Sequence, residues 1–147
     1  RQNVREGDIF MVRDGTYLIG TCAFVTSADV RMVFQSHILK IRVHTGAPFD
    51  NYLLLAVLSS PAVVSQIKAM SFTQDIIDSL GDRIHDLRIP VPRSTIARKK
   101  LSAMVRQAIK HKMQARELVQ RARTHVVNAT GDILHGNAYQ GRIFKGD

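Results

Sequence analysis

Residues 94–127 constrain the fold more than any other part of the chain. Their mostly small and apolar residues recur at alternating steps of three and four, which places them along one side of an α-helix capped by Ser94 or Thr95. At ~1.5 Å per residue, some 30 residues span roughly 45 Å, more than the width of a small domain. The sequence therefore predicts a long helix that pairs with a second helix as in a coiled coil. The pairing stripe consists of Leu101, Met104, Ala108, His111, Ala115, Leu118 and Ala122.

The same helix carries most of the positive charge. The chain has a net charge of +9. Between Arg98 and Arg123 there are nine basic residues and one acidic residue, Glu117, whereas the rest of the chain has twelve basic and eleven acidic residues. This distribution indicates a polyanion or an acidic protein as partner, although a solvated helix face has the same composition. Any DNA contact made by this helix would be to phosphates and would give no choice of sequence.

Residues 8–43 are typical of β structure. Residues 8–13 are rich in strand formers and end at Asp14-Gly15, which predicts a hairpin turn. A second apolar run, residues 17–25, contains Gly20, which indicates a bulge or a close backbone approach. In residues 39–43 the apolar side chains alternate with Lys40 and Arg42, which predicts a strand with one buried face and a cationic opposite face.

Two short helices and an exit segment complete the predicted domain. Asp50 is a predicted N-cap for a helix that runs through Leu58, and Ser60-Pro61 predicts the start of another. We expect both helices to pack on one face of the sheet. A polar loop at residues 71–75 and a return to β character at residues 87–89 follow, before Pro90-Val91-Pro92 ends the domain. The expected fold class is α+β, with a β-rich domain at 1–92, a long helix at 93–128 and a flexible tail at 129–147.

The sequence contains no residue pattern typical of an enzyme. Glu6 and Glu117 are the only glutamates, and neither a Gly-rich phosphate loop nor a His-Glu-x-x-His pair is present. The lone Cys22 excludes an internal disulfide, fits a reducing cytoplasm and is expected to be a buried core thiol. No run of about 18 apolar residues predicts a membrane span. We therefore expect no catalytic residue, no metal and no cofactor.

Polar residues suited to DNA contact occur at the hairpin tip, on the polar strand face and in the loop after the second helix. Arg and Gln can form two hydrogen bonds to a guanine or adenine edge, whereas Lys, Ser and Thr more often contact phosphates. Each of these residues, taken singly, is more often a solvated surface residue. The candidates are Arg13, Thr16, Tyr17, Arg31, Gln35, Lys40, Arg42, Lys68, Ser71, Thr73 and Gln74.

Four segments followed by a long helix occur in an order that is fairly specific. They are GDIFMVRDGT at 7–16, FQSHILKI at 34–41, DNYLLLAVLSS at 50–60 and LRIPVP at 87–92. In this order they resemble the target-recognition domains of the specificity subunits of type I restriction–modification systems. The likeness covers about residues 6–122.

The resemblance implies a non-catalytic specificity module, in the cytoplasm of a prokaryote, that binds double-stranded DNA for other subunits. Its implied partners are a DNA adenine-N6 methyltransferase subunit and a translocating endonuclease subunit. Members of the family usually join two such domains through two antiparallel spacer helices. A chain with one domain and one helix is therefore expected to form a homodimer or to pair with a second recognition half.

Two departures from the family pattern keep alternatives open. Arg93-Ser94-Thr95-Ile96 stands where Glu-Gln commonly opens the spacer helix, and residues 72–84 are closer to recognition regions attached to adenine methylases. The first alternative is therefore the C-terminal specificity region of a fused DNA methyltransferase. The second is a basic coiled-coil adaptor without DNA specificity, and a small nuclease is a third.

Overall fold

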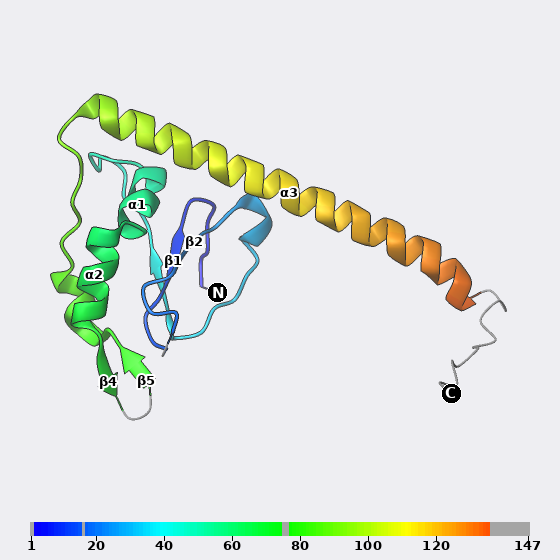
Figure 1. The fold of residues 1–147 in the computed structure, drawn as a ribbon, viewed down its shortest axis with the longest axis horizontal. Coiled ribbons are helices and arrows are strands. Elements are labelled where there is room, and N and C mark those ends of the chain that lie inside the picture. The colour runs from blue at the N-terminus through cyan, green and yellow to red at the C-terminus, as the bar shows by residue number, and fades with distance from the viewer. Residues whose placement is uncertain (1, 16, 75–76, 136–147) are drawn as a thin grey trace, which may run out of the picture. The chain divides into compact units, whose positions relative to one another are not determined.

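The chain combines a small sheet, short helices and one long helix, which confirms the predicted α+β class. The computed structural model describes residues 2–15, 17–74 and 77–135. Two compact units divide the chain, Arg1–Ile109 and Lys110–Asp147. The first unit holds all the strands, the helices α1 and α2, and the first turns of the long helix α3 (Thr95–His135) (Figure 1). The first unit continues to Ile109, and the domain boundary predicted at residue 92 stays a prediction.

A three-stranded antiparallel sheet lies at the centre of the first unit. Strand β1 (Ile9–Val12) pairs with β2 (Cys22–Phe24) on one side and with β3 (Ile38–Ile41) on the other. The turn between β1 and β2 contains Asp14-Gly15, as predicted, but β2 is shorter than the apolar run 17–25. Gly20 has a φ of +80°, and a Cβ there would lie 2.7 Å from the Ile67 side chain, which confirms the predicted close approach.

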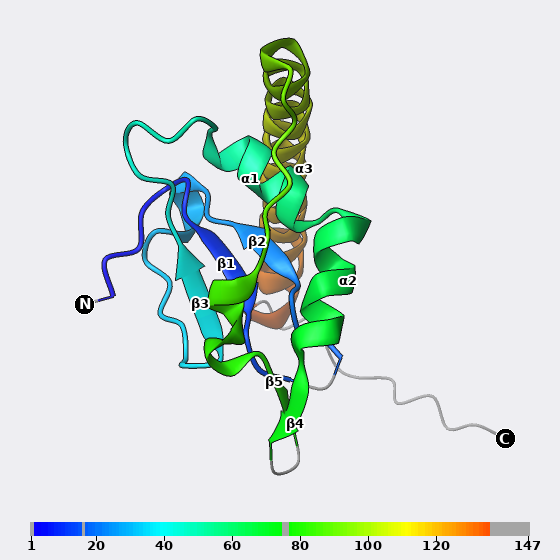
Figure 2. The same ribbon diagram turned by 90° about the vertical axis from the view of Figure 1, so that its left-hand side faces the viewer.

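Helices α1 (Asn51–Leu58) and α2 (Pro61–Met70) lie on one face of the sheet, as predicted (Figure 2). Ile9 and Met11 of β1 point toward them and are fully buried. Leu39, Ile41 and Val43 pack against the same core, so the predicted alternation of β3 is correct. Cys22 is partly buried against it, and burial raises the pKa of its thiol to about 11. The buried core consists of Ile9, Met11, Leu53, Leu54, Val57, Leu58, Val63, Ile67 and Leu80.

A second hairpin replaces the predicted polar loop at residues 71–75. Strand β4 (Phe72–Gln74) pairs antiparallel with β5 (Ile77–Ser79). Its base is joined to the end of β1 by a bridge between Asp14 and Ser79 and by the Leu80 amide, which donates to the Arg13 carbonyl at 3.1 Å. The prediction was wrong because polar residues such as Thr73 and Gln74 belong to a paired strand here, which their composition did not indicate.

The predicted strand at residues 87–89 is also absent, since these described residues form no strand. A 3₁₀ helix (Gly81–Asp86) precedes them. The side-chain amide of Gln66 takes the place of a neighbouring strand, because it accepts from the Arg88 amide at 3.1 Å and donates to the Arg88 carbonyl at 3.0 Å. The backbone is therefore satisfied without a sheet.

Helix α3 begins where predicted but is longer than predicted. Ser94 Oγ accepts from the Ala97 amide at 3.3 Å and caps the first turn. The helix continues through His135, so residues 129–135 of the predicted flexible tail are helical, while residues 136–147 lie outside the described residues. Gly131 lies inside the helix, because a single glycine lowers the stability of a helix by only about 1 kcal/mol.

No single helix in the described ranges is long and apolar enough to cross a membrane. Within those ranges, α1 and α2 reach the required length and composition only as a pair, and this pair is bent by 63°.

Asp50 joins the start of α1 to the first turns of α3. Its Oδ1 accepts from the Leu53 amide at 2.8 Å, which confirms the predicted N-cap. Its Oδ2 accepts a hydrogen bond from Ser102 Oγ and lies 3.7 Å from Arg106 Nη2. The Arg106 guanidinium in turn lies 4.9 Å from the centre of the Tyr52 ring. One carboxylate therefore caps α1 and fixes α3 against it.

We predict that Asp50→Ala lowers the free energy of unfolding by about 1–2 kcal/mol, the usual effect of losing an N-cap. Asp50→Asn keeps a capping oxygen and should lower it less. Ser102→Ala isolates the link to α3. Urea titration followed by circular dichroism measures all three variants, and equal losses for the alanine and asparagine variants would show that the cap contributes nothing.

Candidate nucleic-acid interface

Three segments that are distant in sequence meet at the end of β1. Asp14 follows β1, His37 directly precedes β3, and Ser79 ends β5. The Asp14 carboxylate accepts a hydrogen bond from Ser79 Oγ at 2.5 Å, and His37 Nδ1 lies 3.2 Å from it. The Asp14 side chain is only 7% exposed. We call Asp14, His37 and Ser79, together with Arg13, the Asp14 cluster.

Arg13 is the predicted DNA-contacting residue that this cluster holds most firmly. Its Nε and Nη2 donate to Asp14 Oδ2 at 3.0 Å and 2.9 Å. Its backbone amide donates to the His37 carbonyl at 2.8 Å. The side chain is nevertheless 36% exposed, so Arg13 is both held by Asp14 and partly accessible to solvent.

The Asp14 carboxyl is strongly acidic in this setting. The hydrogen bonds from Arg13 lower its pKa most, those from Ser79 and His37 lower it further, and the positive charge of Arg13 adds to this, so that the pKa falls from 3.8 to about 2 despite burial. The hydrogen bonds to Asp14 raise the pKa of Arg13. The cluster therefore keeps a fixed pair of opposite charges over the physiological pH range.

The turn after Gly15 is strongly exposed and apolar. Tyr17 is 94% exposed and Leu18 62% exposed. Thr16, which was also predicted to contact DNA, lies outside the described residues. The Tyr17 ring is therefore available for stacking, four residues after the arginine that Asp14 orients.

The β4–β5 hairpin lies beside this turn and projects beyond the sheet at the same end (Figures 1 and 2). Thr73 and Gln74, two further candidates, belong to β4, where they pair with Asp78 and Ile77. Sequence reasoning missed Arg83, whose guanidinium lies 4.5 Å from the centre of the Phe72 ring at the base of the hairpin. Its strongest sequence signal, a cation just after the hairpin, was too common to single out.

Lys68 and Ser71 lie at the end of α2, just before this hairpin. Lys68 is exposed in the last turn of the helix. The Ser71 hydroxyl donates to the Lys68 carbonyl at 2.8 Å. Ser71 therefore closes the end of a helix, whereas the Lys68 side chain is exposed to solvent.

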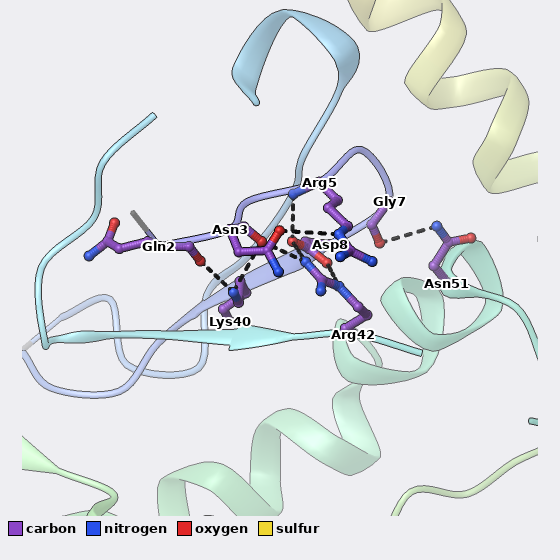
Figure 3. Close-up of polar contacts among 8 residues, drawn as sticks. All are labelled: Gln2, Asn3, Arg5, Gly7, Asp8, Lys40, Arg42 and Asn51. Carbon is purple, nitrogen blue, oxygen red and sulfur yellow. Dashed lines mark hydrogen bonds and ion pairs between the residues drawn. The ribbon is translucent and has the colours of Figure 1, made fainter. Parts of the chain in front are cut away.

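Lys40 and Arg42 were expected to be open to DNA, but both contact the N-terminal segment. They lie on the face of the sheet opposite the core, as predicted, but the N-terminal residues cover this face (Figure 3). Lys40 Nζ donates to the Gln2 carbonyl at 2.6 Å. Arg42 donates through Nε and Nη2 to the carboxylate of Asp8, at 2.6 Å and 2.7 Å, and also to the Asn3 carbonyl at 2.8 Å.

Asp8 is 1% exposed, so it requires this partner, because a buried charge without one is strongly destabilising. Hydrogen bonds from Arg42 and from the Arg5 amide lower the pKa of Asp8 against the opposing effect of burial. The alternation of the strand indicated the face of both cations but not the segment that covers it. Lys40 and Arg42 thus hold the N-terminus in place.

Arg31 and Gln35 lie in the exposed loop between β2 and β3. The side-chain amide of Gln2 holds this loop, since it donates to the Phe34 carbonyl at 2.5 Å and accepts from the Phe34 amide at 2.8 Å. Gln35 comes two residues before His37 of the Asp14 cluster. The structure therefore places Gln35 next to the cluster in sequence and leaves Arg31 further along the loop.

A cleft of about 420 Å³ lies beside the N-terminal network, and Arg5, Asp8, Arg42, His44 and Asn51 contribute to its walls. Its two arginines already donate to Asn3 and Asp8. No group of three or more histidine, cysteine or acidic residues in the described ranges is arranged to hold a metal ion.

Part of the basic run on α3 forms contacts within the chain. Arg98 Nη1 donates to the Pro48 carbonyl at 2.9 Å, and Arg121 pairs with Glu117 at 2.6 Å. All seven residues of the predicted pairing stripe are exposed; Leu118, for example, is 64% exposed. The exposed cations of the same helix include Lys99, Lys100, Lys110, Lys112 and Arg123.

No protein-family model, curated protein or solved structure matches this chain. The chemistry available at the surface is therefore the guide to function. At one end of the first unit it consists of an oriented guanidinium, an exposed tyrosine and a projecting β-hairpin. This set of groups can form hydrogen bonds and stacking contacts with a rigid polar ligand.

The low pKa of Asp14 predicts a pH dependence of stability. Because the pKa is lower in the folded protein than the ordinary 3.8, the ionised carboxylate stabilises the fold above about pH 4, and this stabilisation is lost as the pH falls toward about 2. The wild type should therefore be more stable than Asp14→Asn at pH 6, and the difference should shrink between pH 4 and pH 2. Thermal unfolding at a series of pH values measures it. A difference that does not change with pH would contradict the role of the charge.

Proposed function

We propose that this chain is a sequence-specific DNA-binding module without catalytic activity of its own. The observation that carries the proposal is that the β1–β2 and β4–β5 hairpins meet at the Asp14 cluster. Arg13 is partly exposed there, and Tyr17 is strongly exposed in the turn that follows β1. A two-stranded β-ribbon fits the major groove of B-DNA, where the base edges present their hydrogen-bonding groups. The β4–β5 hairpin supplies such a ribbon, and the bridge between Asp14 and Ser79 gives it a firm base.

Helix α3 supports the proposal through its charge and its exposed apolar stripe. Its lysines and arginines supply cations for phosphate contacts, which add affinity and salt dependence. Its apolar stripe fits a second helix, from another copy of the chain or from a second recognition half. Two recognition units joined in this way would read a split target.

The resemblance to type I specificity subunits supplies the context of the proposal. In that context the module directs a DNA adenine methyltransferase subunit, and an endonuclease or translocase subunit, to its site in the cytoplasm of a prokaryote. A C-terminal specificity region of a fused methyltransferase uses the same interface. A catalytic methyltransferase domain encoded directly upstream of Arg1 would favour this variant.

Selection of bound duplexes from a random pool tests the proposal. We expect the purified protein to enrich one motif, and the logarithm of its affinity to fall linearly with the logarithm of salt concentration. Equal affinity for all duplexes would contradict specific recognition. Binding to an acidic protein with no affinity for DNA would support the adaptor alternative, and metal-dependent cutting of plasmid by the pure protein would support the nuclease alternative.

The pairing role of α3 has a separate test. Leu118→Asp places a charge in the proposed stripe and should lower the mass measured by light scattering from that of a dimer to that of a monomer. Thr124→Asp introduces the same charge on the opposite side of the helix and should leave the dimer intact. Loss of the dimer in both variants, or in neither, would contradict pairing through the stripe.

A further inference from the structure

We propose that Arg13 reads a guanine in the recognition sequence and that Asp14 is the positioning residue that presents Arg13 to it. This inference rests on the proposed function, since it requires that the hairpin end meet a DNA duplex. It goes further in naming a base and the two residues that select it.

The geometry of the guanidinium leads to this inference. A guanidinium has two edges, each with a pair of parallel N–H donors. Asp14 occupies the edge formed by Nε and Nη2, at 3.0 Å and 2.9 Å. The edge formed by Nη1 and Nη2 remains, and no hydrogen bond from Nη1 is found within the described part of the chain. Two parallel donors match the O6 and N7 acceptors of guanine in the major groove.

Arg13 is held on both sides of its Cα. Its amide donates to the His37 carbonyl at 2.8 Å, and its carbonyl accepts from the Leu80 amide at 3.1 Å. Asp14 is held in turn by Ser79 Oγ. The side chain is therefore ordered before DNA binds, so binding does not have to immobilise a flexible arginine.

The charges around Arg13 favour a base over a phosphate. The Asp14 carboxylate offsets its positive charge at contact distance, and the charge of Asp82 also acts on it. The negative charges of Asp14 and Asp82 weaken the attraction between Arg13 and a phosphate. They do not affect the directional hydrogen bonds that Nη1 and Nη2 can donate. A neutral base edge is the ligand that such an arginine binds best.

Two other arginines of this unit, Arg42 and Arg83, are placed differently. Arg42 uses the same Nε and Nη2 atoms for Asp8, but its Nη2 also donates to Asn3 beneath the N-terminal segment. Arg83 lies over the Phe72 ring. Arg13 combines an oriented guanidinium with an open edge at the end of the sheet.

Selection from a random duplex pool, carried out with wild type and variants of the full chain, tests the inference. The wild-type motif should contain a G·C pair whose preference is lost in Arg13→Ala and in Arg13→Lys, since lysine keeps the charge but lacks the two parallel donors. Affinity for the wild-type site should fall about 10- to 100-fold. Asp14→Asn should weaken the same preference. Arg93→Ala, which removes the same charge from an exposed position before α3, is the control and should select the wild-type motif.

A second measurement identifies the contacted atom. Replacing that guanine by 7-deazaguanine removes the N7 acceptor, and it should weaken binding by the wild type but not by Arg13→Ala. Thermal unfolding of each variant reports whether it is folded. Arg13→Lys, which keeps a positive charge next to Asp14, keeps the test decisive if Asp14→Asn is unstable.

The possible failures are distinguishable. If the wild type selects no motif, the proposed function fails and the inference fails with it. If the wild type selects a motif that Arg13→Ala and Arg13→Lys still select unchanged, or a motif without a required guanine, the function stands and the inference is overturned. If Arg13→Ala weakens all duplexes alike, Arg13 contacts a phosphate and the inference is also overturned.

Discussion

The arrangement of the first unit depends on one buried carboxylate at the end of its central strand. Asp14 contacts the side chain of Arg13, which precedes it, that of His37 before β3 and that of Ser79 at the end of β5. The carboxylate has enough acceptor positions for all three, so its neighbours can come from three parts of the sequence. Without it, the second hairpin would lose a side-chain contact with the sheet, and the partly exposed Arg13 would lose the hydrogen bonds that orient it.

Asp50 has the equivalent role at the start of α1. There, too, each carboxylate oxygen contacts a different segment, with the α1 backbone on one side and α3 on the other. In both places the acidic residue follows a regular element or precedes one, where backbone groups lack regular partners. A domain with a core this small is thus joined at its ends by polar contacts as well as by apolar packing.

The sequence predicted the features that depend on local periodicity. The long helix, the alternation of β3 and the cap at Asp50 each follow from residues within a few positions of one another. The features that it missed depend on distant partners. Strand alternation placed Lys40 and Arg42 on the correct face, but Asp8 and the N-terminal carbonyls that bind them lie more than 30 residues away. Asp14 was interpreted as a turn residue, because its link to Ser79 spans 65 positions.

The β4–β5 hairpin is attached to the rest of the unit mainly at its base, through Asp14, Ser79 and Leu80. Among the described core residues, Leu80 is the one that this segment contributes, and it lies after the second strand. The sheet and the two helices packed on it therefore place few demands on the outer part of the hairpin. Substitutions on the described parts of these two strands should therefore disturb the scaffold less than substitutions in its core, so the hairpin can change in sequence while the rest of the unit keeps its fold.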